Sequence, residues 1–126
     1  MPTSKLWVDL TVDHAEVLRG FYSDVIGWKS EAVDVGEYND YIMTENGELI
    51  AGICHNRDTN YGVPPVWIPY FEVESLEKSL QMCINQGGSV IKPIAVIMES
   101  KKYAVIQDPC GAVCAIWSET ITSSDR

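Results

Sequence analysis

The chain has 126 residues, of which 46% are hydrophobic, and a formal net charge of −9 at pH 7. This length and composition suit a single globular domain, whereas the acidic balance disfavours nucleic acids and anionic membrane surfaces as partners. No apolar run approaches the length of a membrane span, and no basic-then-apolar leader is visible. Four cysteines without C-x-x-C or disulfide-framework spacing fit a reducing compartment, so we expect a cytoplasmic protein.

The alternation of apolar residues over 6–12 predicts a strand with one buried face. The opposite face carries Trp7, Asp9 and Thr11, which is an unusual set for a surface that meets only water. The sequence therefore raises the question of whether this second face meets solvent, a metal ion or a ligand.

A helix is expected next, over residues 14–27. Asp13 can cap it, Glu16 completes a capping-box pattern, and Gly27 ends it. The buried face of this helix is expected to hold six apolar side chains: Val17, Leu18, Phe21, Tyr22, Val25 and Ile26. Two strand-like segments follow over 38–44 and 48–55, and the Asn-Gly pair between them is a strong hairpin signal.

The pattern then starts again after a polar, proline-bearing stretch. A strand over 68–75 leads to a helix that Ser75 can cap and that Gly87 and Gly88 end. Further extended segments and a final strand over 112–117 complete the second half.

The two halves match in spacing. Fifteen residues separate Val12 from Gly27, and fourteen separate Val73 from Gly87. Each half therefore reads as a strand, a helix and a run of antiparallel strands, which indicates an internal repeat. Both helices would cover one face of the combined sheet and leave the other face open.

Three short segments of the sequence resemble motifs of a known family: "FYSDVIGW", "NQGGSV" and "QDPCGA". They resemble the helix-end, Gly-Gly and Asp-Pro-x-Gly landmarks of the vicinal oxygen chelate superfamily, which includes glyoxalase I, bleomycin-resistance proteins and extradiol dioxygenases. The resemblance implies an α+β fold of two tandem βαβββ modules, which form a curved mixed sheet around a central cavity with the helices outside.

The resemblance also implies the domain organisation. Residues 1–118 would form a single glyoxalase/bleomycin-resistance-like domain, with module one at about 5–56, a linker at 57–66 and module two at about 67–118. Residues 119–126 read as a polar tail. Many members of the superfamily dimerise, so a homodimer is expected.

In metal-using members each half supplies two ligands, one from its first strand and one from its last. Carried onto this sequence, the first-strand positions are Trp7 and Ile68, and the last-strand positions are Ala51 and Ala115. None of these side chains can ligate a divalent ion, since such sites need imidazole, carboxylate or thiolate donors. We therefore expect no metal at the usual site and no cofactor.

One alternative stays open for a metal. By strand alternation, His55 follows Ala51 and Ile53 onto the face expected to line the cavity. His55 together with Asp9 or Glu72 could form a displaced site.

Alternation also predicts which residues bind a ligand. The predicted ligand-binding residues are Trp7, Asp9, Thr11, Ile53, His55, Ile68, Tyr70, Glu72 and Trp117. Aromatic walls with few polar groups are typical of a small-molecule pocket. Asp9 and Glu72 occupy equivalent positions in the two halves, so at least one could have a raised pKa and accept a proton or hold a cationic group.

Three functions fit these features. The first is a metal-free small-molecule-binding protein with its ligand in the cavity between the modules. The second is an enzyme, a lyase, isomerase or oxidoreductase, with a non-standard or metal-independent site and Asp9 or Glu72 as general base. The third is an interaction module with a closed cavity. We rank them in this order.

Overall fold

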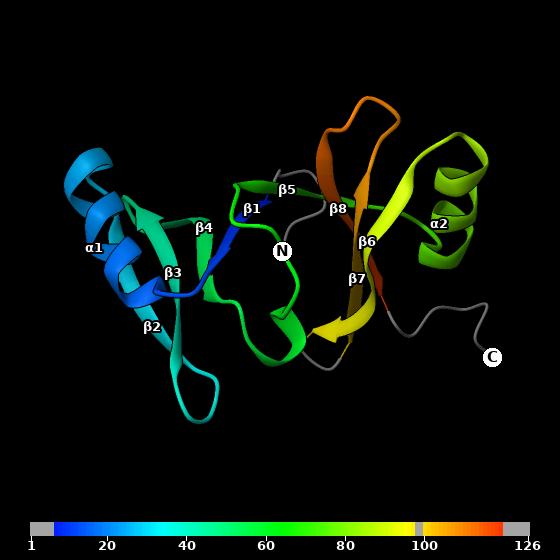
Figure 1. The fold of residues 1–126 in the computed structure, drawn as a ribbon. Coiled ribbons are helices and arrows are strands. Elements are labelled where there is room, and N and C mark those ends of the chain that lie inside the picture. Colours follow the sequence, from blue (N-terminus) through cyan, green and yellow to red (C-terminus); the bar gives the residue numbers. More distant parts are fainter. Residues whose placement is uncertain (1–6, 98–99, 120–126) are drawn as a thin grey trace. The chain divides into compact units, whose positions relative to one another are not determined.

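The computed structural model describes residues 7–97 and 100–119, so Leu6 and residues 120–126 of the predicted tail lie outside it. The chain divides into two compact units, Trp7–Ile68 and a second unit that begins at Pro69. Each unit has the order strand, helix, three strands (Figure 1). The predicted α+β fold and its repeat are therefore confirmed, while the central cavity between the modules stays a prediction.

The first unit contains β1 (Trp7–Val12), α1 (Ala15–Ile26), β2 (Lys29–Asp34), β3 (Asn39–Glu45), β4 (Glu48–His55) and a short 3-10 turn (Asp58–Asn60). Its strands lie in the order β2-β3-β4-β1. β1 pairs with β4 in parallel, and the other pairs are antiparallel. Asn46 and Gly47 have φ angles of 52° and 80°, the left-handed conformation of a two-residue hairpin turn, as predicted.

The start of α1 differs from the prediction. The N-cap residue is His14 rather than Asp13, and no side chain caps the helix. Glu16 lies beside His55 instead, with 3.4 Å between Oε2 and Nε2, so the capping box does not form. Gly27 ends the helix as predicted, with a φ of 97° that favours glycine.

α1 also buries fewer side chains than predicted. Leu18 and Tyr22 pack against the core, but Val17, Phe21 and Val25 are each more than half exposed. Because these three residues follow one another at every fourth position, they form a continuous apolar line, which we call the α1 stripe.

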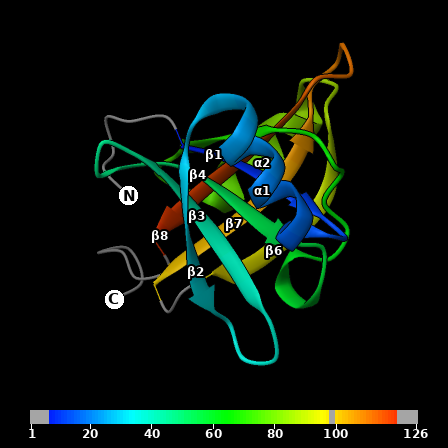
Figure 2. The same cartoon turned by 90° about the vertical axis from the view of Figure 1, so that its left-hand side faces the viewer.

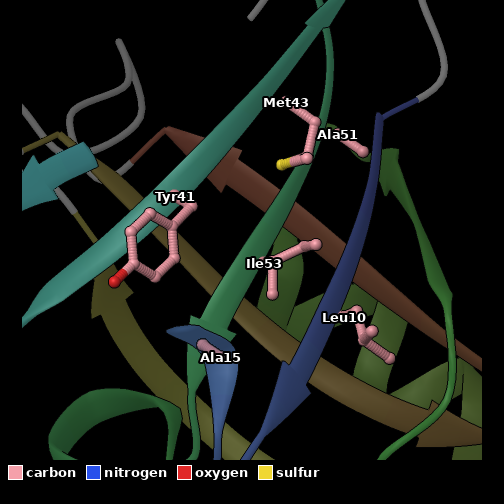
Figure 3. Close-up of a cluster of buried hydrophobic side chains, with 6 residues drawn as sticks. All are labelled: Leu10, Ala15, Tyr41, Met43, Ala51 and Ile53. Atoms are coloured by element: carbon pink, nitrogen blue, oxygen red, sulfur yellow. The ribbon is translucent and has the colours of Figure 1, made fainter. Parts of the chain in front are cut away.

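The core of the first unit lies between α1 and its sheet. Figure 2 shows α1 in front of β3 and β4 of its own unit. The core consists of six buried side chains, drawn in Figure 3: Leu10, Ala15, Tyr41, Met43, Ala51 and Ile53. Leu10 is the register partner of Ile53, and Met43 of Ala51. These residues of β1, β3 and β4 therefore share the face that α1 covers.

The second unit contains β5 (Ile68–Glu72), except for its first residue, and α2 (Leu76–Asn85), β6 (Ser89–Ile97), β7 (Lys101–Gln107) and β8 (Val113–Glu119). Its strands lie in the order β5-β8-β7-β6, with β5 and β8 parallel. Within residues 7–97 and 100–119, no helix combines the length and apolar character needed to cross a membrane.

The cap and the end of α2 form as the sequence predicts, whereas Ile84, predicted to face inward, is 54% exposed. The hydroxyl of Ser75 accepts a hydrogen bond from the Lys78 backbone N–H at 3.3 Å, which satisfies one of the free donors at the helix start. The chain leaves the helix through Gly87 and Gly88, whose N–H groups donate to carbonyls of the last turn. Leu76 anchors the helix in a small buried cluster on the sheet.

Candidate functional site

The face of the first unit's sheet that points away from α1 brings several candidate residues together. Trp7, Asp9 and Thr11 alternate along β1 with residues that pack in the α1-side core, so they point to the opposite face. Their register partners on β4 are Gly52, opposite Asp9, and Cys54, opposite Thr11. We call this surface the Asp9 face.

Two neutral donors hold the Asp9 carboxylate. The indole Nε1 of Trp7 donates to Asp9 Oδ1 at 2.6 Å, and the backbone N–H of Gly52 donates to the same carboxylate. Hydrogen bonds to an ionised acceptor are stronger than those between neutral groups. The carboxylate is therefore fixed in orientation by its own strand and by the neighbouring strand β4.

The surroundings of Asp9 disfavour its ionised form. Taken together, these surroundings raise the pKa of Asp9 from 3.8 to about 6: burial raises it most and the nearby Asp40 carboxylate also raises it, while the hydrogen bonds from Trp7 and Gly52 lower it. Among the residues that the structure describes, no basic side chain forms an ion pair with Asp9. A desolvated carboxylate without a countercharge is typical of a group that binds a ligand or transfers a proton.

The Cys54 thiol, which lies on the same face, is expected to be unreactive. Burial strongly raises the pKa of Cys54, and the charges of Asp9 and Asp40 raise it further. Since the thiolate is the reactive form of cysteine, Cys54 is a poor nucleophile. The neighbouring His55 lies on the other side of the sheet, so the two do not form a thiol–imidazole pair.

The prediction that Ile53 and His55 share a face with Asp9 is wrong. Ile53 is fully buried in the core beneath α1 (Figure 3). The His55 ring lies 3.4 Å from carboxylate oxygens of both Glu16 on α1 and Asp40 on β3. His55 therefore ties the helix to the sheet and cannot form a displaced metal site with Asp9.

A β-bulge explains this error. Thr44 pairs with Leu49, but the preceding Met43 pairs with Ala51, so Ile50 is an extra residue in β4. One extra residue reverses the faces of all residues that follow it, relative to a count from the hairpin turn. The position on β4 that faces the same way as Asp9 is consequently Gly52.

The positions that the resemblance assigns to metal ligands do not fit a metal. On β4 the residue on the same face as Asp9 is Gly52, not Ala51. Glycine has no side chain that could bind a metal, and the side chains at the other three positions, Trp7, Ile68 and Ala115, also lack a metal-binding atom. Among the described parts of the chain, no group of three or more His, Cys, Asp or Glu side chains could hold an ion.

The second unit carries a more apolar set on the face away from α2. The ring centroids of Tyr70 and Tyr103 are 5.7 Å apart, and the Lys101 ammonium lies 5.6 Å from the centre of the Trp117 ring. β5 contributes the remaining predicted binding residues, Ile68 and Glu72, to this face. Ile68 is buried and Glu72 is exposed, and the roles of all these residues in binding stay predictions.

Comparison with known proteins gives a family match. The model of the Glyoxalase/Bleomycin resistance protein/Dioxygenase superfamily matches residues 6–116. A protein of Mycobacterium tuberculosis that carries the name glyoxylase CFP32 is 31% identical over 114 residues, which cover 88% of this chain and 44% of that protein. The anthracycline biosynthesis protein DnrV of Streptomyces peucetius is 26% identical over 133 residues, which cover 95% and 48%. The chain thus spans about half the length of these relatives.

A solved structure shows the same fold. It is a glyoxalase/bleomycin resistance protein/dioxygenase superfamily member from Vibrio splendidus 12B01, similar with a TM-score of 0.58 over 90% of this chain and 97% of that chain. The sequence identity is 14%, so the likeness concerns the fold alone.

Proposed function

The chain belongs to the glyoxalase/bleomycin resistance protein/dioxygenase superfamily, and we propose that it binds a small organic molecule on the Asp9 face without a metal ion. The observation that carries this proposal is the Asp9 carboxylate, which is partly desolvated and has no basic partner among the described residues. A ligand that brings an ammonium or N–H group to it would offset the desolvation.

The other side chains on this face narrow the class of ligand. The Trp7 ring offers a flat apolar surface beside the carboxylate, and aromatic faces attract both rings and organic cations. Asp40 adds a second carboxylate close enough to influence the titration of Asp9. We therefore propose an aromatic or cationic small molecule, and an aromatic amine combines both features.

The proposal predicts a charge-selective interaction. Phenethylamine, as a simple aromatic amine, is expected to bind the wild-type protein at pH 8, whereas its anionic counterpart phenylacetate is not. Asp9→Asn should weaken amine binding about ten-fold or more, because hydrogen bonds to charged groups contribute about 1.5–3 kcal/mol. Calorimetric titration measures this, with Asp24→Asn as the matched control for an exposed carboxylate on α1.

Two results would overturn the proposal. One is equal affinity of wild type and Asp9→Asn for the amine, or no binding at all. The other is a stoichiometric content of Ni, Zn, Fe, Mn or Mg after purification without chelators, because the residues named above offer no site for such an ion.

A second function, metal-independent catalysis, is favoured by the pKa of Asp9, which at about 6 suits a general base near neutral pH. The names of the relatives, a glyoxylase and an anthracycline biosynthesis protein, also fit an enzyme. In this reading the ionised Asp9 would take a proton from a bound substrate while Trp7 and Gly52 keep the carboxylate in place. Turnover that rises with pH through about 6 and is lost in Asp9→Asn would separate catalysis from simple binding.

We also propose that the chain forms a homodimer in the cytoplasm. The four cysteines are free thiols, which fits a reducing compartment. The α1 stripe supports association, since exposed apolar lines on helices are typical of contact surfaces. Phe21→Glu, in the middle of the stripe, is therefore expected to shift a dimer toward monomer in sedimentation equilibrium; a monomeric wild type would contradict the dimer.

A further inference from the structure

Gly52 lies in the middle of β4, where a glycine calls for an explanation. Its φ is not in the left-handed region, unlike those of Gly27 and Gly47, so the backbone conformation does not require glycine. A glycine inside a strand weakens the strand and often marks the close approach of another group. The reason for Gly52 must therefore be the space beside it.

The Asp9 carboxylate fills that space. A Cβ atom on Gly52 would overlap Asp9 Oδ1, and it would also lie 3.2 Å from Asp9 Cγ and 3.5 Å from Trp7 Cζ2. Because Asp9 and Gly52 are register partners in the parallel pair of β1 and β4, the missing side chain lets the carboxylate turn across the pair. There it accepts hydrogen bonds from both Trp7 and the Gly52 backbone.

We propose that Gly52 is the positioning residue of this face: by giving its side-chain space to the Asp9 carboxylate, it places an anion where a side chain from β4 would otherwise stand. The face then accepts ligands that present an ammonium or N–H group to a protein carboxylate. This specificity rests on the proposed binding function, whereas the steric relation between the two residues does not depend on it.

The steric relation is tested by a double-mutant cycle in thermal unfolding. Gly52→Ala is expected to lower the melting temperature in the wild-type background and to lower it much less in an Asp9→Ala background, where no carboxylate competes for the space. Gly20→Ala serves as the control, because a Cβ on this α1 residue meets nothing within 4 Å. An equal loss in both backgrounds would overturn the inference.

A spectroscopic readout separates positioning from a merely structural role. The chain has four tryptophans, and Trp7→Phe identifies the Trp7 indole N–H resonance in a nitrogen–proton correlation spectrum. In the wild type this resonance should shift with pH as Asp9 titrates, with Asp40 and Cys54 as the other titratable neighbours. In Gly52→Ala the shift should be lost, since the displaced carboxylate no longer accepts from the indole.

The outcomes distinguish this inference from the proposed function. If the pH-dependent shift persists in Gly52→Ala, the positioning role of Gly52 is wrong whatever the protein binds. If the shift is lost as expected and the affinity for phenethylamine falls about ten-fold or more, both ideas stand. Loss of the shift in a protein whose wild type binds no amine would uphold the positioning and overturn the proposed ligand class.

Discussion

Replacement of Ile53 by alanine is expected to lower the free energy of unfolding by about 2–5 kcal/mol. Ile53 is fully buried between β4 and α1, so the shorter side chain would leave a cavity that the tight core cannot close. Urea denaturation followed by circular dichroism measures the change.

Leu49→Ala is the matched control on the same strand, because Leu49 is 58% exposed and its truncation should change stability by no more than about 0.5 kcal/mol. If Ile53 lined a ligand pocket instead of the core, its replacement would reduce ligand affinity and leave stability nearly unchanged. That pattern would contradict the placement of Ile53 beneath α1.

Asp9→Asn is expected to make the fold more stable at pH 8, by about 3 kcal/mol. The pKa of Asp9 is about 6 in the folded protein against an ordinary value of 3.8, and each unit of difference corresponds to about 1.4 kcal/mol. An asparagine keeps an oxygen that can accept from Trp7 and Gly52 but carries no charge to desolvate.

The gain in stability of Asp9→Asn over wild type should increase as the pH rises. Between pH 3.8 and about 6 the folded protein binds more protons than the unfolded chain at Asp9, so stability is highest below this window and is lost as pH rises through it. The difference between Asp9→Asn and wild type should therefore be small near pH 4 and reach its full size above pH 6.

Denaturation of both proteins across this pH range tests the prediction, with Asp24→Asn, which removes an exposed carboxylate on α1, as the control variant. An Asp9→Asn protein that is no more stable than wild type at pH 8 would mean that the carboxylate is well solvated. Functional sites commonly lower the stability of a protein, as the buried charge of Asp9 is predicted to do here.

Local signals in the sequence predicted part of the fold because each acts within a few residues. Ser75 caps α2, and Asn46 and Gly47 form the hairpin turn, since a single side chain or a left-handed φ decides each case. Asp13 does not cap α1, because the N-cap residue is the next one, His14, and Glu16 lies beside His55, which is 39 residues away in the chain. Such a tertiary contact is invisible to a local pattern.

The faces of β4 could not be predicted by counting from the turn. Both alternating sets of this strand are largely apolar, so periodicity alone does not say which set meets the helix. The extra residue Ile50 then reverses the count. This hid Gly52 and Cys54 as the neighbours of Asp9 and made Ile53 and His55 look like site residues.

The position of Asp9 itself was predictable from the sequence. Its place between Trp7 and Thr11 on the face opposite the core follows from simple alternation. The effect of the Asp40 charge on the pKa of Asp9 could not be predicted from the sequence, because β3 comes close to Asp9 only through its pairing with β4. A glycine within an otherwise apolar strand was the one available signal for a close approach at residue 52.

Calorimetric titration of the wild-type protein with phenethylamine at pH 8 and pH 5, both in excess EDTA, tests the central claim most directly. Binding is expected to persist in the chelator at pH 8 and to weaken about ten-fold at pH 5, where protonation removes most of the charge from Asp9. Loss of binding on chelation, or equal affinity at the two pH values, would contradict a metal-independent site centred on Asp9.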